Sequence, residues 1–128
     1  AHNPAAADMM AASIEHYFKG KRLIYIMGVF ADKDYRSVIE KTAHFADQIL
    51  TIQTPDNVRA LPAEELAEAV SEYNPNVQAM HTIADAVEKA FELVGEEDVI
   101  IAFGSLSFIG KMTDIVEEHK KFQKSKKE

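Results

Sequence analysis

Two hydrophobic periods alternate along this chain, and that alternation limits the folds open to it more than any other feature. Nearly continuous apolar runs, typical of strands buried on both faces, occur at residues 22–30, 48–54, 76–80 and 98–104. Stripes of apolar residues at helical spacing occur at residues 4–18, 35–45, 62–73, 83–94 and 108–119. One helix followed by four strand–helix units predicts an α/β, Rossmann-like fold: a mainly parallel sheet with helices on both faces.

The stripes also predict which side chains face the sheet. In the first helix, which we expect to stop at Gly20, the inward residues are Met10, Ile14, Tyr17 and Phe18. In the third helix, which we expect to start at Pro62, they are Leu66, Val70 and Tyr73. Inward residues should be buried between helix and sheet.

The chain starts almost directly with its first helix. Asn3 is a good N-cap, and Pro4 suits the first helical position because its missing N–H costs nothing there. A strand normally leads into such a helix in an alternating fold, so we expect the first strand of the sheet to be missing ahead of Ala1. The strand position left unpaired would invite pairing with another chain.

Charge divides the chain into an acidic body and a basic end. The whole chain has 14 basic and 21 acidic residues, and the end "KKFQKSKKE" (120–128) holds five of the former and one of the latter. We expect one domain over 1–119 and a frayed tail over 120–128, with a nucleic-acid or lipid contact as the tail's alternative. The acidic body argues against nucleic-acid binding, which needs a basic face.

Two features that the sequence lacks exclude further classes of protein. The chain has no Cys, which excludes a disulfide framework, a thiol nucleophile and a cysteine zinc site. It also has neither a run long and apolar enough to span a bilayer nor a basic leader with a cleavage site. We therefore expect a cytoplasmic protein that does not enter a membrane.

The carboxyl ends of parallel strands meet at one edge of a sheet, where ligands bind in folds of this type. The segments expected at that edge are 30–34, 53–57, 80–82 and 104–107, joined by residues 1–3 if a strand precedes them. Polar and charged side chains in these segments are therefore the candidate binding residues.

One of these segments, "GSLSFIGK", invites comparison with the phosphate loop of nucleotide-binding enzymes. It is not that loop, because five residues rather than four separate Gly104 from Gly110, and Met112 stands where a Ser or Thr must hold magnesium. Ser105 and Ser107 still lie between a strand and a helix N-terminus, where free N–H groups favour an anion. The alternative is that the serines only cap the helix.

Another segment, "FADKDY", places Lys33 between Asp32 and Asp34 at a strand end. Asp34 suits a helix N-cap, and Lys33 is either a contact for a substrate carboxylate or part of a solvated turn. His2, beside Asn3, could donate to the same anion. The remaining histidines share no metal-ligand spacing, so we expect no metal site.

Three segments together resemble a known family. "AHNP", "GVFADKD" and "GSLSFIG", in this order and separated by α/β units, are similar to segments of the carboxyl-terminal domain of folylpolyglutamate synthase, which in many bacteria is also dihydrofolate synthase. The family's segments read D-G-A-H-N-P, G-[VAL]-[LMF]-x-D-K-D and G-S-L-[YF]-x-[VI]-G. This chain departs at Ser107, where the family has an aromatic residue, and the family's ATP-contacting Asp would lie two places before Ala1.

The resemblance implies an ATP-dependent ligase that adds L-glutamate to folate, to dihydropteroate or to both, through an acyl phosphate. It places His2, Lys33 and Ser105 on the glutamate side, and Asn3 and Asp32 nearer the nucleotide. It also implies that the phosphate loop and the Mg²⁺ ligands belong to an amino-terminal ATPase domain, the partner of this one. The chain alone is then expected to be inactive and to contain no catalytic residue.

Two alternatives remain open at the level of sequence. The chain could be the corresponding domain of another amide ligase, of the muramyl or cyanophycin type, since these carry words similar to "AHNP". It could also be a non-enzymatic α/β binding module of receiver type. Such a module needs a cluster of acids at its strand ends, and Asp32 and Asp56 are the only acids nearby.

Overall fold

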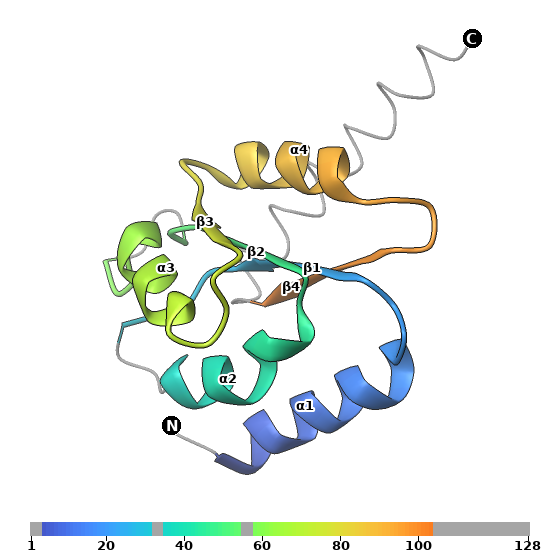
Figure 1. The fold of residues 1–128 in the computed structure, drawn as a ribbon. Coiled ribbons are helices and arrows are strands. Elements are labelled where there is room, and N and C mark those ends of the chain that lie inside the picture. The colour runs from blue at the N-terminus through green and yellow to red at the C-terminus, as the bar shows by residue number, and fades with distance from the viewer. Residues whose placement is uncertain (1–3, 32–34, 55–57, 104–128) are drawn as a thin grey trace, which may run out of the picture.

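The computed structural model describes residues 4–31, 35–54 and 58–103, and these form a parallel sheet covered by helices (Figure 1). The helices are α1 (Pro4–Phe18), α2 (Tyr35–Thr42), the short 3₁₀ helix η1 (Ala43–Phe45), α3 (Ala63–Ser71) and α4 (Ile83–Leu93). The strands are β1 (Leu23–Met27), β2 (Gln48–Thr51), β3 (Val77–Ala79) and β4 (Val99–Phe103). The predicted alternation of helix and strand is confirmed over the described residues. The expected helix at 108–119 and the tail at 120–128 lie outside them.

The four strands lie in the order β3-β2-β1-β4, and every neighbouring pair is parallel. The chain moves from β1 to β2 and then to β3 in one direction, and β4 returns to the other side of β1. β1 therefore has a hydrogen-bonded neighbour on both sides and is fully buried. β4 is only half-buried along most of its length.

The side chains of β1 alternate between two hydrophobic clusters, one on each face of the sheet. Leu23, Tyr25 and Met27 belong to a cluster with residues of α1, α2 and α3. Ile24 and Ile26 belong to a second cluster with the inner side of α4. Figure 1 shows α4 on one side of the sheet and α1 and α2 on the other. The predicted Rossmann-like arrangement, with helices on both faces, is confirmed.

The prediction of an inward side chain is wrong at two positions. Tyr17 is 72% exposed and Tyr73 is 44% exposed. In α1 the buried stripe runs through residues 10, 14 and 18, spaced by four, and Tyr17 lies about 100° around the helix from the last of these. Tyr73 follows the end of α3 at Ser71, so helical periodicity no longer sets its direction.

The expected turn after α1 is confirmed at Gly20. Its φ is +80°, a left-handed conformation that glycine adopts without a Cβ penalty. The N–H of Lys21 donates to the carbonyl of Phe18 at 2.9 Å, which satisfies a carbonyl at the helix end. The expected N-cap at Asn3 lies outside the described residues.

The strands are shorter than the apolar runs that predicted them. β1 ends at Met27 instead of residue 30, and β2 ends at Thr51 instead of residue 54. The residues left over do not extend the ladder. They form the connections at the carboxyl edge of the sheet, where Phe30 pairs with Ala60 in an antiparallel bridge.

Candidate functional site

The carboxyl ends of the strands lie level with one another. Met27 is in register with Thr51 on one side and with Phe103 on the other, and Thr51 is in register with Ala79. The N–H of Gly28 donates to the carbonyl of Phe103 at 2.9 Å, just beyond the β1–β4 ladder. The connections that follow the four strands therefore leave from a single edge of the sheet, which we call the carboxyl edge.

A change of direction occurs between β1 and β4. β1 leads to α2 and β2 on one side, whereas β4 is reached from α4, which packs on the opposite face. Where successive connections diverge in this way, an open α/β sheet leaves a crevice outside its strand ends. The two segments that carry the sequence motifs, 28–34 and 104–110, both follow the strands that flank this point.

The five predicted site residues fall outside the part of the chain that the structure describes. They are His2, Asn3, Asp32, Lys33 and Ser105, and their positions stay predictions. Ala31, which precedes Asp32 and Lys33, and Phe103, which precedes Ser105, both lie at the carboxyl edge. His81 follows β3 and is exposed, and its neighbour Thr82 caps α4 by accepting from the N–H of Asp85 at 3.0 Å.

Two connections at the carboxyl edge are joined by backbone hydrogen bonds. The N–H of Ala31 donates to the carbonyl of Arg59 at 2.7 Å, and the N–H of Leu61 donates to the carbonyl of Val29 at 3.0 Å. We call residues 29–31 and 59–61 the clasp. Sequence reasoning missed it, because "PDNVRALP" (55–62) carries no strand signal.

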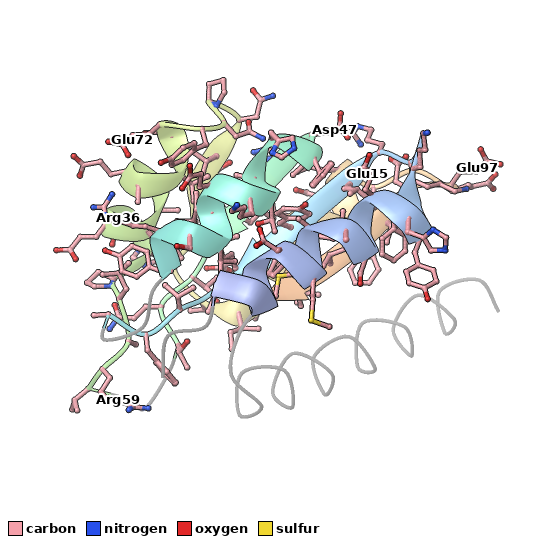
Figure 2. The ribbon with its side chains drawn as sticks, turned by 90° about the horizontal axis from the view of Figure 1, so that it is seen from below. Glu15, Arg36, Asp47, Arg59, Glu72 and Glu97 are labelled. Carbon is pink, nitrogen blue, oxygen red and sulfur yellow. The ribbon has the colours of Figure 1, made fainter. Side chains whose placement is uncertain are left out.

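The clasp also includes a side-chain contact. The guanidinium carbon of Arg59 lies 4.7 Å from the centroid of the Phe30 ring, within the range of a cation–π interaction. Figure 2 shows Arg59 at the far end of the molecule from Asp47 and Glu97, which lie near the starts of β2 and β4. The contact therefore belongs to the end of the molecule where the expected binding segments are.

Gly28 and Thr54 pack closely beside the clasp. A Cβ placed on Gly28 would lie 3.2 Å from the Thr54 hydroxyl oxygen. Thr54 is 2% exposed, and its hydroxyl has no hydrogen-bond partner among the residues that the structure describes. A buried hydroxyl without a partner is unfavourable for folding. Such groups are uncommon in native proteins, and this one lies at the carboxyl edge.

Among the described residues, the titratable groups with displaced pKa values lie away from this edge. Burial in the core raises the pKa of Tyr25, whose hydroxyl donates to the Thr42 carbonyl at 2.8 Å. The N–H of Gly95 and the guanidinium of Arg22 lower the pKa of Asp98 at the amino end of β4. These shifts have structural causes, so they do not mark a catalytic group.

A surface hollow of about 320 Å³ opens between α2 and α3. Its lining residues are Tyr35, Arg36, Glu65, Glu68, Ala69 and Glu72. Arg36 lies 3.8 Å from Glu72, so its charge is already partly balanced (Figure 2). Three glutamates around the hollow would repel an anionic substrate, which leaves the carboxyl edge as the candidate site.

The described residues contain no group of three or more His, Asp or Glu side chains that could hold a metal ion. Within the same residues, no helix has the length and apolar character needed to cross a membrane.

Comparison with known proteins identifies relatives along most of the chain. A dihydrofolate synthase/folylpolyglutamate synthase of Haemophilus influenzae is 28% identical over 121 residues, which cover 91% of this chain and 27% of that protein. A protein of the same name from Mycobacterium tuberculosis is 31% identical over 98 residues, which cover 75% of this chain and 20% of that protein. The chain therefore spans about a quarter of the length of these relatives.

The fold leads to the same relatives. The structure of Mycobacterium tuberculosis folylpolyglutamate synthase complexed with ADP matches with a TM-score of 0.76 and 26% identity, over 90% of this chain and 28% of that one. A family model described as "Mur ligase, glutamate ligase domain" matches residues 1–106. The match includes all four strands and the whole of the connection that follows β1, and it ends three residues beyond β4. The chain belongs to the Mur ligase family, as a glutamate ligase domain.

Proposed function

We propose that this chain is the carboxyl-terminal domain of an ATP-dependent ligase that adds L-glutamate to folate polyglutamates, to dihydropteroate or to both. The observation that carries the proposal is the register of Met27 with Phe103. The two strands that precede the "GVFADKD" and "GSLSFIG" segments in sequence therefore end side by side. The names of the relatives and the ADP complex of the Mycobacterium tuberculosis enzyme support the same activity.

The proposed reaction has two steps. The γ-phosphoryl group of ATP passes to a substrate carboxylate, giving an acyl phosphate and ADP. The amino group of glutamate then attacks the acyl carbon, the C–N bond forms, phosphate leaves, and the nitrogen loses a proton. Both steps develop negative charge, so catalysis depends on positioned donors and cations.

In this proposal the present domain binds glutamate at the carboxyl edge. His2, Lys33 and Ser105 each offer a donor suited to a carboxylate, and glutamate presents two carboxylates. Asn3 and Asp32 are assigned nearer to the nucleotide. The described residues offer no set of metal ligands, so Mg²⁺ is assigned to the amino-terminal ATPase domain of the longer protein.

The test uses Lys33→Ala in the full-length ligase, with KM measured separately for glutamate and for ATP. Loss of one charge-assisted hydrogen bond should lower kcat/KM for glutamate by about ten- to a hundredfold. Lys41→Ala is the matched control, because Lys41 is on α2 and pairs with Asp8 at 2.9 Å. A change in the KM for ATP alone, with the KM for glutamate unaltered, would contradict the assignment of Lys33.

A second measurement tests the division of labour between domains. The 128-residue chain alone should neither hydrolyse ATP nor join glutamate to folate, because the proposed reaction needs the ATPase domain. ATP turnover by the chain alone, lost on mutation of its own residues, would show that the domain assignment is wrong.

A further inference from the structure

The clasp links the connection that bears Lys33 to the hydrophobic core. On one side of it, residues 29–31 lead directly into the segment 32–34. On the other side, Ala60 and Leu61 are buried, and Leu61 packs in the same cluster as Met27, Ile39 and Leu66. Residues 59–61 are therefore held by the core, and residues 29–31 are held by residues 59–61.

A further hydrogen bond fixes the far end of the same connection. The hydroxyl of Thr51, at the end of β2, donates to the carbonyl of Ala63 at 2.7 Å. Thr51 is fully buried, so this bond is shielded from water. The chain from Arg59 to Ala63 thus has anchors at both ends: the backbone pairing with residues 29–31 and the bond to β2.

The cation–π contact lies at the surface of the clasp. It involves the one exposed long side chain among the described residues of the clasp. Arg59 is exposed and Phe30 is half-buried, and the guanidinium covers the ring at 4.7 Å. The contact restrains Phe30, whose neighbours Val29 and Ala31 form the backbone hydrogen bonds of the clasp. Losing it would loosen residues 29–31 without opening the core.

We propose that Arg59 and Phe30 are positioning residues that hold the segment bearing Lys33 in place for glutamate. The proposal rests on the proposed function. Lys33 follows Ala31 by two residues in sequence, so a change in residues 29–31 would pass directly into the segment that bears it. Neither Arg59 nor Phe30 is a catalytic residue, and their effect passes through the backbone. Small displacements of a binding group are enough to lower rates strongly.

The test compares Arg59→Ala, Phe30→Leu and their double variant in the full-length ligase. Each single variant should raise KM for glutamate about five- to tenfold, with KM for ATP unchanged. The effects of the two single variants should be less than additive in the double variant, because both changes remove the contact that Arg59 and Phe30 share. Arg59→Lys keeps a cation over the ring and should restore most of the loss.

Arg36→Ala is the matched control. Its guanidinium also lies over an aromatic ring, that of Tyr35 at 5.7 Å, but on α2 outside the clasp. It should leave both KM values unchanged. Hydrogen exchange gives a readout independent of activity: the amide protons of Ala31 and Leu61 should exchange faster in Arg59→Ala than in Arg36→Ala.

The outcomes separate this proposal from the one on which it rests. If Lys33→Ala leaves KM for glutamate unchanged, the assignment of Lys33 to glutamate in the proposed function is wrong and the clasp proposal falls with it. If Lys33→Ala raises KM for glutamate but Arg59→Ala does not, only the clasp proposal is overturned. Additive effects of Arg59→Ala and Phe30→Leu, or equal changes in the KM for ATP, would overturn it too.

Discussion

Gly28 packs against Ile52 so closely that no side chain fits between them: a Cβ on Gly28 would lie 2.5 Å from Cδ1 of Ile52. Gly28 is the first residue after β1, and its N–H donates to the Phe103 carbonyl at 2.9 Å. The glycine therefore lets three strand ends approach one another at the carboxyl edge. The close approach, and no unusual backbone angle, is what requires glycine here.

Gly28→Ala should destabilise the chain by roughly 1–3 kcal/mol, because Ile52 is fully buried and has little room to move. Ile52→Val removes the clashing Cδ1 and should alone cost about 0.5–1.5 kcal/mol. The double variant should be less destabilised than the sum of the two changes. Urea unfolding of the four proteins measures this coupling, and strict additivity would contradict the steric account.

Thr54→Val should stabilise the chain by about 1 kcal/mol, since it replaces a buried hydroxyl that has no partner with a methyl group of similar size. Thr51→Val is the matched control, because the Thr51 hydroxyl donates to the Ala63 carbonyl at 2.7 Å. That change should destabilise the chain by about 1–2 kcal/mol. Equal effects of the two substitutions, measured by urea unfolding, would show that the Thr54 hydroxyl is satisfied in solution.

Tyr25→Phe should make the chain less sensitive to alkaline pH. Burial raises the pKa of Tyr25 in the folded state, whereas the unfolded chain releases this proton near pH 10. The contribution of the neutral phenol is thus fully present below about pH 10 and is lost as the pH rises above that value. Unfolding free energies measured between pH 8 and 11 should fall less steeply in the variant.

At neutral pH the same variant should lose about 1–2 kcal/mol, because the hydroxyl no longer donates to the buried Thr42 carbonyl at 2.8 Å. Tyr17→Phe is the control, since Tyr17 is 72% exposed and its change should leave the free energy of unfolding at pH 7 unaltered. If the free energy of unfolding falls equally steeply with rising pH in Tyr25→Phe and in the parent chain, another group causes that fall.

Asn74→Asp should destabilise the chain by roughly 2–4 kcal/mol. The buried Asn74 amide nitrogen donates to the carbonyls of Ala43 and Ala46, at 2.9 and 2.8 Å. A carboxylate has no hydrogen to donate and would face both oxygens. Asn76→Asp, at an exposed position that uses only its backbone N–H in this network, is the matched control. Chemical denaturation of the pair should separate them clearly.

Hydrophobic periodicity predicted the described helices and strands because it is a local property of the chain. It did not predict that β4 pairs with β1, since the order of parallel strands depends on how the connections cross the sheet. Tyr17 was wrong because it lies around α1 from the buried stripe that includes Phe18. Tyr73 was wrong because it lies two residues beyond the end of α3 at Ser71.

The candidate site was likewise predictable only in part from the sequence. The sequence motifs indicated which strand ends matter, and the register of Met27 with Phe103 brings those ends together. The clasp was not predictable, because the bridge between Phe30 and Ala60 joins two connections with no periodic pattern. The roles of His2, Lys33 and Ser105 stay predictions, as these residues lie outside the described part of the chain.

The position of β1 between β2 and β4 has a consequence for synthesis on the ribosome. Leu23 pairs with Val99, so one edge of the most buried strand stays open until nearly the whole described chain has been made. Closing so long a loop is entropically costly and slows folding. A nascent chain that pauses before Phe103 would present an apolar strand with unpaired N–H and C=O groups, and capture by a neighbouring nascent chain would begin there.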